Sequence, residues 1–272
     1  MMANPLRTLL TALLTAATCL TLAYGIVGVG LYVCTTPAAT AAVGNTFSSW
    51  DRAVYPKEDM AALAEATRSF SIEGTAAEDL FALIGETIAR NNPALAAALE
   101  KGSLEGADTS AINQNALESA LESGNAGSLS LAAIMEEYSL PADALSHLKD
   151  CTPIFTTARI SIGVIGFMGL AGLVALWILC GRRRAGATMM AAGAVVLLLL
   201  LGLASWAIID FNGLFTAMHT VLFAQGNWTF SYDSLLIQMF PEAFWAAMAG
   251  LWVLVSVGCA AVFLLVGKLL SR

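Results

Sequence analysis

The sequence predicts an all-α membrane protein with four transmembrane helices, and three observations support this fold class. Of its 272 residues 58% are hydrophobic and only 12% are charged, whereas soluble domains average about a quarter charged residues. Four apolar runs have about 20 residues or more, enough to cross roughly 30 Å of hydrocarbon at 1.5 Å per residue. The basic residues also gather in short segments at one predicted side of the membrane, which orients the spans.

The first span covers residues 9–33, within an N-terminal transmembrane anchor assigned to residues 1–34. This run is longer than the 7–15 apolar residues typical of a signal peptide. We therefore expect a retained anchor, although residues 39–41 resemble a cleavage site. Small residues at its outer end favour close helix–helix approach in lipid: Gly25, Gly28 and Gly30.

Residues 35–153 are predicted to form a mostly helical loop domain outside the membrane. From Cys34 to Pro153 there are 17 Asp/Glu and 6 Lys/Arg, a charge of 6 − 17 = −11. The segments before the first span, between the second and third spans and after the fourth span contain only basic charges. The positive-inside rule therefore places these segments, and with them both termini, in the cytoplasm. Those basic residues are Arg7, Arg182, Arg183, Arg184, Lys268 and Arg272.

Within this loop, residues 35–49 are small and polar and are expected to be coil. Two apolar stripes at helical spacing follow, broken by Asn91-Asn92-Pro93: Met60, Leu63, Ala64 and Thr67, then Leu80, Leu83, Ile84 and Ile88. Residues of about 74–127 are interpreted as a partly flexible insertion. A further helix is expected over 142–150, with Pro141 near its first turn.

Residues 154–272 are predicted to form a membrane domain with spans at 154–180, 188–209 and 243–266. Between the last two lies an interfacial or re-entrant segment, 211–242, which is rich in aromatic side chains. Such rings settle at the membrane–water boundary, where one end is apolar and the other wet.

The chain has only two histidines, and the predicted topology places both outside, near the lipid boundary. His147 has Asp143 four residues before it and Asp150 three after, so both carboxylates share its helix face. A neighbouring carboxylate orients an imidazole and raises its basicity. His219 follows the third span. The two histidines are a candidate catalytic dyad, with an ordinary solvated helix end and a backbone-satisfied polar residue as the alternatives.

Other chemistries have weaker support. Both histidines with Asp150 or Asp233 would just reach the three ligands of a catalytic zinc, but no HExxH or CxxC spacing is present, and we expect no metal. No GxSxG elbow marks a serine nucleophile, although Ser146, Ser231 and Ser234 stay open. Nothing basic faces outward to attract nucleic acid. A disulfide between Cys34 and Cys151 is allowed outside the cell and also stays open.

A set of spaced residues resembles a known family of bacterial integral membrane proteins, the lipoprotein intramolecular transacylases. It comprises Phe215-x3-His219-x3-Phe223, Asn227-Trp228-x-Phe230, Asp233-x-Leu235-Leu236-Ile237, Phe240-Pro241-Glu242 and His147-x2-Asp150. The resemblance covers roughly residues 129–265 and the first span.

This resemblance implies an acyltransferase of the bacterial cell membrane whose active site lies on the outer face. The sn-2 acyl chain of an S-diacylglyceryl N-terminal cysteine would move to that cysteine's α-amino group, giving a lyso-form lipoprotein. Diacylated lipoproteins and membrane lipid are the implied partners, and no cofactor is implied. The oligomeric state and the identity of the client lipoproteins stay open.

The resemblance also implies site residues. His147 and His219 are the expected catalytic pair, with His219 as the base and His147 oriented by Asp150, although these roles can be exchanged. A supporting shell is expected from Asp150, Asn227, Trp228, Asp233 and Glu242, and acyl-chain contacts from Phe223 and Phe240. Two other functions stay open from the residues themselves: a non-enzymatic scaffold or lipid-binding protein, and a lipid ester hydrolase in which water replaces the amine.

Overall fold

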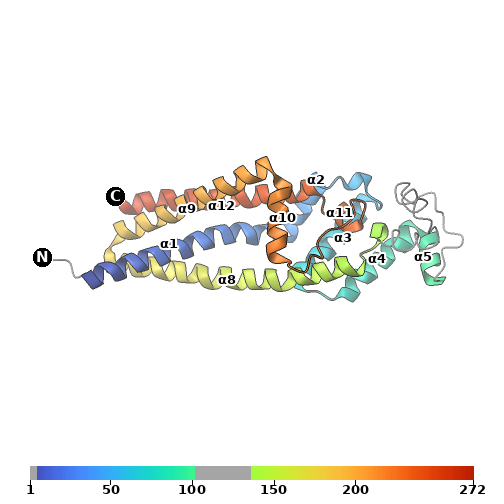
Figure 1. The fold of residues 1–272 in the computed structure, drawn as a ribbon, viewed down its shortest axis with the longest axis horizontal. Coiled ribbons are helices and arrows are strands. Elements are labelled where there is room, and N and C mark those ends of the chain that lie inside the picture. The colour runs from blue at the N-terminus through green and yellow to red at the C-terminus, as the bar shows by residue number, and fades with distance from the viewer. Residues whose placement is uncertain (1–4, 102–135) are drawn as a thin grey trace. The chain divides into compact units, whose positions relative to one another are not determined.

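The computed structural model describes residues 5–101 and 136–272, and the chain divides into two compact units. The bundle unit comprises Met1–Thr36, Ile154–Met218 and Met248–Arg272. The histidine unit comprises Pro37–Pro153 and His219–Ala247. Figure 1 labels the helices of both units along the chain. The described residues form helices, turns and loops without any strand, which confirms the all-α fold class.

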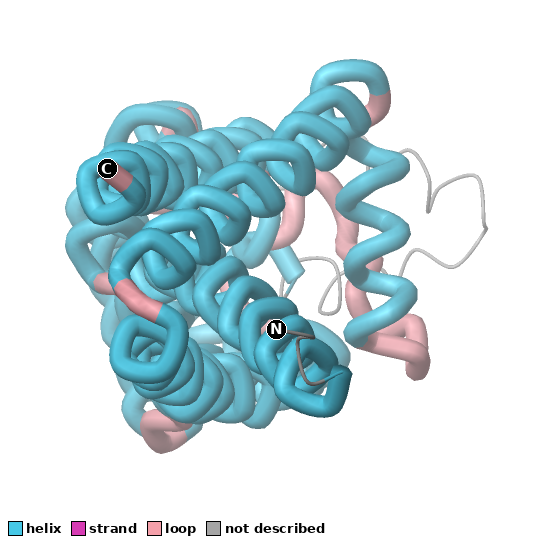
Figure 2. The backbone as a smooth tube through the Cα atoms, turned by 90° about the vertical axis from the view of Figure 1, so that its left-hand side faces the viewer, coloured by secondary structure: helices cyan, strands magenta, loops and turns pink. Residues whose placement is uncertain are grey.

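The bundle unit is built from four long helices, and each is long and apolar enough to cross a membrane. They are α1 (Pro5–Cys34), α8 (Ala142–Cys180), α9 (Arg182–Ile209) and α12 (Glu242–Ser271). Their large apolar side chains are widely exposed, as expected of helices that face lipid. The prediction of a four-span membrane protein is therefore confirmed. The first turn of α1 and the last turn of α12 lie at the same end of this unit (Figures 1 and 2).

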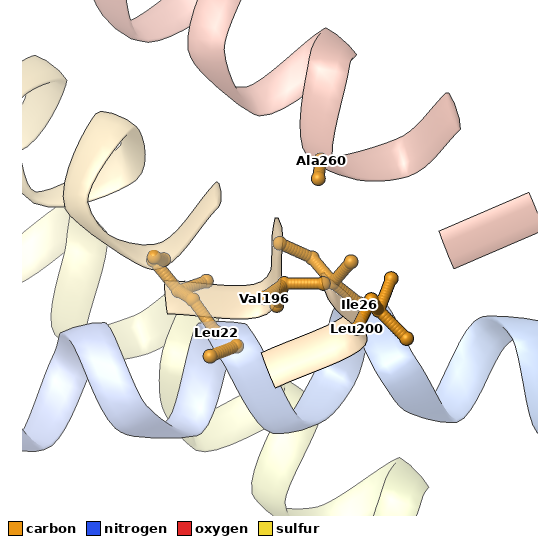
Figure 3. Packing of buried hydrophobic residues seen from close by; sticks show 7 residues of the cluster. Leu22, Ile26, Val196, Leu200 and Ala260 are labelled. Atoms are coloured by element: carbon orange, nitrogen blue, oxygen red, sulfur yellow. The ribbon is translucent and has the colours of Figure 1, made fainter. Parts of the chain in front are cut away.

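A compact apolar cluster holds three of these helices together. Leu22 and Ile26 of α1 pack against Val196 and Leu200 of α9, and Ala260 of α12 points toward them (Figure 3). The glycines of α1 allow the close approach expected from the sequence. A Cβ atom on Gly28 would lie 2.7 Å from Ile162, and one on Gly30 would lie 2.5 Å from the Ser256 hydroxyl.

The same principle joins α9 to α12. A Cβ atom on Gly186 would lie 2.5 Å from the carbonyl oxygen of Gly267, and one on Gly267 would lie 2.6 Å from that of Gly186. Only glycine at both positions lets the two backbones come this close. In lipid, where burial of apolar surface does not drive helices together, such close packing is a main source of association.

The histidine unit consists of shorter helices joined by loops. They are α2 (Pro37–Phe47), η1 (Trp50–Arg52), α3 (Lys57–Arg68), η2 (Ser69–Glu73), α4 (Ala77–Asn91), α5 (Pro93–Lys101) and α11 (Leu235–Met239), with the first turns of α8 and α12 and the last turn of α10 (Phe211–Leu222). The expected buried stripe of α3 is fully buried, and the helix break at Asn91-Asn92-Pro93 falls between α4 and α5.

Two expectations need correction. Residues 37–47 are helical rather than coil, because four of these eleven residues are alanine, the strongest helix former. The helix expected over 142–150 does not end there but continues past Pro153 to Cys180. In α4, three residues of the expected stripe are buried together with Thr87, and Leu83 is half-buried. The central part of the expected insertion, residues 102–127, lies outside the described residues.

Polar contacts fix the segment around α11 against the helices that precede the site. Trp50, 3% exposed, donates its indole N–H to the carbonyl oxygen of Met239 at 3.2 Å. The Val54 N–H donates to the side-chain oxygen of Gln238 at 2.8 Å. These bonds position the stretch that follows α10 within the histidine unit.

Candidate functional site: a buried pair of histidines

His147 lies in the second turn of α8, just after a helix start set by Pro141. The carbonyl oxygen of Pro141 accepts the first helical bond, from the Leu145 N–H at 3.0 Å. Upstream, the buried Tyr55 hydroxyl donates to the Tyr138 carbonyl oxygen at 2.7 Å and anchors the approach to this helix. His147 is 9% exposed and precedes the apolar part of α8 that begins at Ile154.

His219 lies in the last turn of α10 and is 8% exposed. Its carbonyl oxygen accepts from the Phe223 N–H at 2.7 Å, and Gly226 then turns the chain with φ of 78°. A glycine adopts this left-handed backbone without steric cost. After this turn, the side chains of Trp228 and Phe230 reach the histidine rings.

The two imidazole rings face each other with centroids 6.0 Å apart and planes 28° from parallel. Phe223 contacts both rings, with centroid distances of 4.5 Å to His147 and 5.6 Å to His219. Phe230 lies 5.7 Å from His147, and Trp228 lies 5.1 Å from His219. Aromatic rings therefore surround a polar pair, an arrangement suited to a reaction at an apolar chain.

Asp150 binds two amide side chains rather than a histidine. One oxygen, Oδ2, accepts from the Gln225 amide at 2.8 Å and from the Asn227 amide at 3.0 Å. The Asn227 amide nitrogen also lies 3.4 Å from the Ser146 hydroxyl. The sequence analysis expects Asp150 to orient His147; the bonds it accepts instead orient the loop that follows α10.

Burial controls the protonation of His147. Burial and, to a smaller extent, the neighbouring His219 lower the pKa of His147 from 6.5 to about 4, while the Asp150 carboxylate opposes the shift. His147 is therefore neutral near pH 7, with one ring nitrogen carrying hydrogen and the other accepting. Its Nε2 lies 4.0 Å from the Cys151 sulfur. Burial, with Asp150 adding to it, raises the pKa of the Cys151 thiol to about 12.

Three buried polar atoms among the described residues of this unit have no hydrogen-bond partner: Oγ of Ser48, Nδ1 of His147 and Oδ1 of Asn227. Leaving a buried donor or acceptor unpaired costs about 1–3 kcal/mol. The last two belong to residues that the sequence indicates for the site. Unpaired buried groups of this kind are the natural contact points for a bound molecule.

Three further residues expected at the site have the following surroundings. Phe240 packs on Phe244 and Trp245, with centroids 5.0 Å and 6.1 Å away. Asp233 is exposed, and its backbone carbonyl oxygen accepts a hydrogen bond from the Gln238 side chain. Burial of Glu137 raises the pKa of that carboxyl group, and the charge of Asp233 adds to the increase. Glu242 is exposed in the first turn of α12.

The structure also brings in residues that the sequence analysis did not select. Phe230 belongs to the aromatic-rich segment and to the Asn227-Trp228-x-Phe230 motif, so the sequence already pointed toward it, although it was not named as a site residue. Cys151 is four residues after His147, a spacing that places both on one helix face. Gln225 carries no sequence signal of its own, because its role depends on the turn at Gly226.

The structure bears on three alternatives from the sequence: a metal site, a serine nucleophile and a disulfide. Within residues 5–101 and 136–272, no three His, Cys, Asp or Glu side chains come together to hold a metal ion. The Ser234 hydroxyl caps α11 by accepting from the Ile237 N–H and donating to the Ser231 carbonyl oxygen. All five cysteines are free, so Cys34 and Cys151 are not joined.

Fold and site together define the class: a helical, multi-pass membrane protein with a buried histidine pair in aromatic surroundings. Residues 112–245 match the family described as "Lipoprotein intramolecular transacylase Lit", which confirms the family resemblance over that part of the chain. The match includes both histidines. It starts and ends earlier than the resemblance drawn from the motifs, and the first span lies outside it. No curated protein and no solved structure matches the chain.

Proposed function

We propose that this protein is a lipoprotein intramolecular transacylase of the bacterial cell membrane. It moves the sn-2 acyl chain of an S-diacylglyceryl N-terminal cysteine to the α-amino group of the same cysteine. The observation that carries the proposal is the buried pair of His147 and His219, 6.0 Å between ring centroids, inside the segment that matches the transacylase family. The two histidines are far apart in the sequence, and the fold of the histidine unit brings them together.

The first step is attack of the amine on the ester. An N-terminal α-amino group has a pKa of about 7.7–8.0, and aromatic surroundings favour its neutral, nucleophilic form. The amine nitrogen forms a bond to the sn-2 carbonyl carbon, and His219 accepts the proton that the nitrogen loses. The lowered pKa of His147 makes it a weak proton acceptor, so we assign the role of base to His219.

His147 serves as the donor to the developing oxyanion. The protonated Cys151 thiol beside Nε2 favours the tautomer in which Nε2 accepts and Nδ1 carries the hydrogen. That places an N–H on the buried nitrogen that has no partner. A preorganised donor of this kind, held in surroundings poor in water, stabilises the tetrahedral intermediate strongly.

The second step restores the proton balance. The carbon–oxygen bond to the glycerol breaks, and His219 returns its proton to the departing alkoxide, which becomes a hydroxyl. One ester is lost, one amide is formed, and the total mass is unchanged. Phe223, Phe230 and Trp228 surround the histidines with apolar surface for the acyl chain.

We further propose that both termini are cytoplasmic. The basic residues in the first turn of α9 lie beside the end of α12: Arg183 donates to the carbonyl oxygen of Ser271 at 3.2 Å. Arg184 reaches the Thr15 hydroxyl of α1 at 3.5 Å. The basic first turn of α9 thus contacts both α1 and the end of α12, which supports the orientation under the positive-inside rule.

The proposal is tested by expressing the protein in cells that lack lyso-form lipoproteins and analysing a lipoprotein's N-terminal peptide by mass spectrometry. The expected product is N-acyl-S-monoacylglyceryl cysteine at unchanged mass, so fragmentation must locate the acyl chain. Loss of one acyl chain would identify an ester hydrolase. An unmodified peptide from cells shown to contain the protein would favour the scaffold function and overturn the proposal.

A further inference from the structure

The orientation of the Asn227 amide is fixed by Asp150. An ionised carboxylate only accepts hydrogen bonds, so the amide must turn its NH2 group toward Asp150 Oδ2, 3.0 Å away. The same NH2 group lies 3.4 Å from the Ser146 hydroxyl. Turning the amide over would place two acceptors against each other. The carbonyl oxygen Oδ1 is therefore held away from Asp150.

That oxygen is buried and has no hydrogen-bond partner. It is an acceptor, so only a donor satisfies it. The S-diacylglyceryl group of the proposed substrate carries esters and a thioether, none of which donates. The donor nearest the reacting ester is the cysteine α-amino group, which has a second N–H besides the one removed during attack.

The position of Asn227 agrees with this pairing. Its side chain spans Ser146 and Asp150, which flank His147 on α8. The next residue, Trp228, packs on His219, with ring centroids 5.1 Å apart. An amine bound at Asn227 thus lies by the two rings that handle its proton and the oxyanion.

We propose that Asn227 is the amine-binding residue of the transacylase and that it selects transfer over hydrolysis. This inference rests on the proposed function. Oδ1 accepts one N–H of the α-amino group and directs the nitrogen lone pair at the sn-2 carbonyl carbon. Without that contact, water attacks the same carbon: its oxygen forms the new bond, the glycerol oxygen leaves with a proton, and free fatty acid is released.

The chain provides a matched control. Gln225 and Asn227 both donate to the same oxygen of Asp150, at 2.8 Å and 3.0 Å. Gln225→Ala and Asn227→Ala each remove one donor from Asp150, but only the latter removes the buried Oδ1. If Asn227 acted only by donating to Asp150, the two variants would lose activity equally. If Asn227 binds the amine, only Asn227→Ala changes the ratio of amide to fatty acid.

The experiment uses the full-length protein in detergent–lipid micelles with a synthetic S-diacylglyceryl cysteine peptide. Both N-acyl peptide and free fatty acid are quantified by mass spectrometry. Asn227→Ala is expected to slow amide formation about 10–100-fold, as loss of a positioning contact does, and to raise the share of fatty acid. Gln225→Ala is expected to keep the wild-type product ratio.

A second variant, Asp150→Asn, preserves side-chain volume and lets the Asn227 amide turn over; it is expected to raise the fatty-acid share partially. Equal losses of rate in the two alanine variants at an unchanged product ratio would overturn the inference, as would wild-type behaviour of Asn227→Ala. A wild-type protein that forms no amide would instead overturn the proposed function.

Discussion

The two units of this protein are held together in different ways. In the bundle unit, helices approach through glycines such as Gly186 and Gly267 and through a small apolar cluster. In the histidine unit, short helices are joined by hydrogen bonds from buried side chains to distant backbone, such as Trp50 to Met239 and Tyr55 to Tyr138. In lipid, close packing is a main source of helix association. In the histidine unit, directional hydrogen bonds instead hold the loops in one arrangement.

This difference explains where the chemistry lies. Long apolar helices satisfy their own backbone and present few polar side chains. Buried polar atoms without a partner occur in both units, with Nε of Arg159 and Oγ of Ser256 in the bundle unit, but those of the histidine unit include Nδ1 of a paired histidine and the nearby amide oxygen of Asn227. Damage to the bundle unit should therefore change stability, and damage at the histidines should change chemistry.

The largest expected effect comes from His219→Ala. Loss of a general base lowers the rate of transfer by about 10²–10⁴-fold, while the protein still inserts into the membrane with nearly wild-type thermal stability. Ser205→Ala is the matched change in the bundle unit, because that exposed hydroxyl bonds only to its own helix at Leu201. Transfer is measured by mass spectrometry of the peptide product. Equal activity of the two variants would contradict the assignment of His219.

Trp50→Ala tests the polar and apolar links of the histidine unit together. The change leaves a cavity and removes the donor to the Met239 carbonyl oxygen, and it should cost about 3–5 kcal/mol. Limited proteolysis should then cut within the histidine unit while the bundle helices stay protected. Trp50→Phe is the milder control, since it retains an aromatic ring. Simultaneous cleavage of both units would show that they do not unfold separately.

The sequence predicts the helical elements better than it predicts the site. The four spans follow from length and composition, and the buried stripe of α3 follows from helical spacing. The small, polar residues 35–49 are expected to be coil, yet residues 37–47 contain four alanines and are helical. Local propensity outweighed the apparent polarity of the segment.

Distances within the site could not be read from the chain. Asn227, Asp233 and Glu242 all belong to one motif, but only Asn227 lies by the α8 residues that flank His147. The turn at Gly226 and the hydrogen bonds of Asp150 decide which side chains converge. The sequence separation of two residues on one helix determines whether they share a helix face. The separation of two residues on either side of a turn does not determine the distance between their side chains.

Gly186→Leu probes the bundle unit alone. Its side chain would meet the carbonyl oxygen of Gly267 across α9 and α12, and overpacking of this kind costs about 1–3 kcal/mol. Gly202→Leu on the same helix is the matched control, because nothing lies within 4 Å of its added Cβ. Thermal unfolding should separate the two variants, whereas the ratio of amide to fatty acid should stay at the wild-type value in both. A change in that ratio would mean that bundle packing also controls the chemistry.

The smallest effect concerns the pH dependence of stability in the histidine unit. The pKa of His147 is about 4 in the folded protein and 6.5 without burial, so the unfolded chain binds more protons between these values. Stability should therefore fall as pH decreases from about 6.5 toward 4. His219 lowers this pKa and Asp150 raises it, so the slope reflects the whole pair and its neighbour. His147→Gln removes the titrating ring, and its unfolding temperature should fall less than that of the wild-type protein between pH 7 and pH 5. Identical slopes would mean that His147 is not held neutral by burial, and the assignment of His147 as oxyanion donor rather than base would lose its electrostatic support.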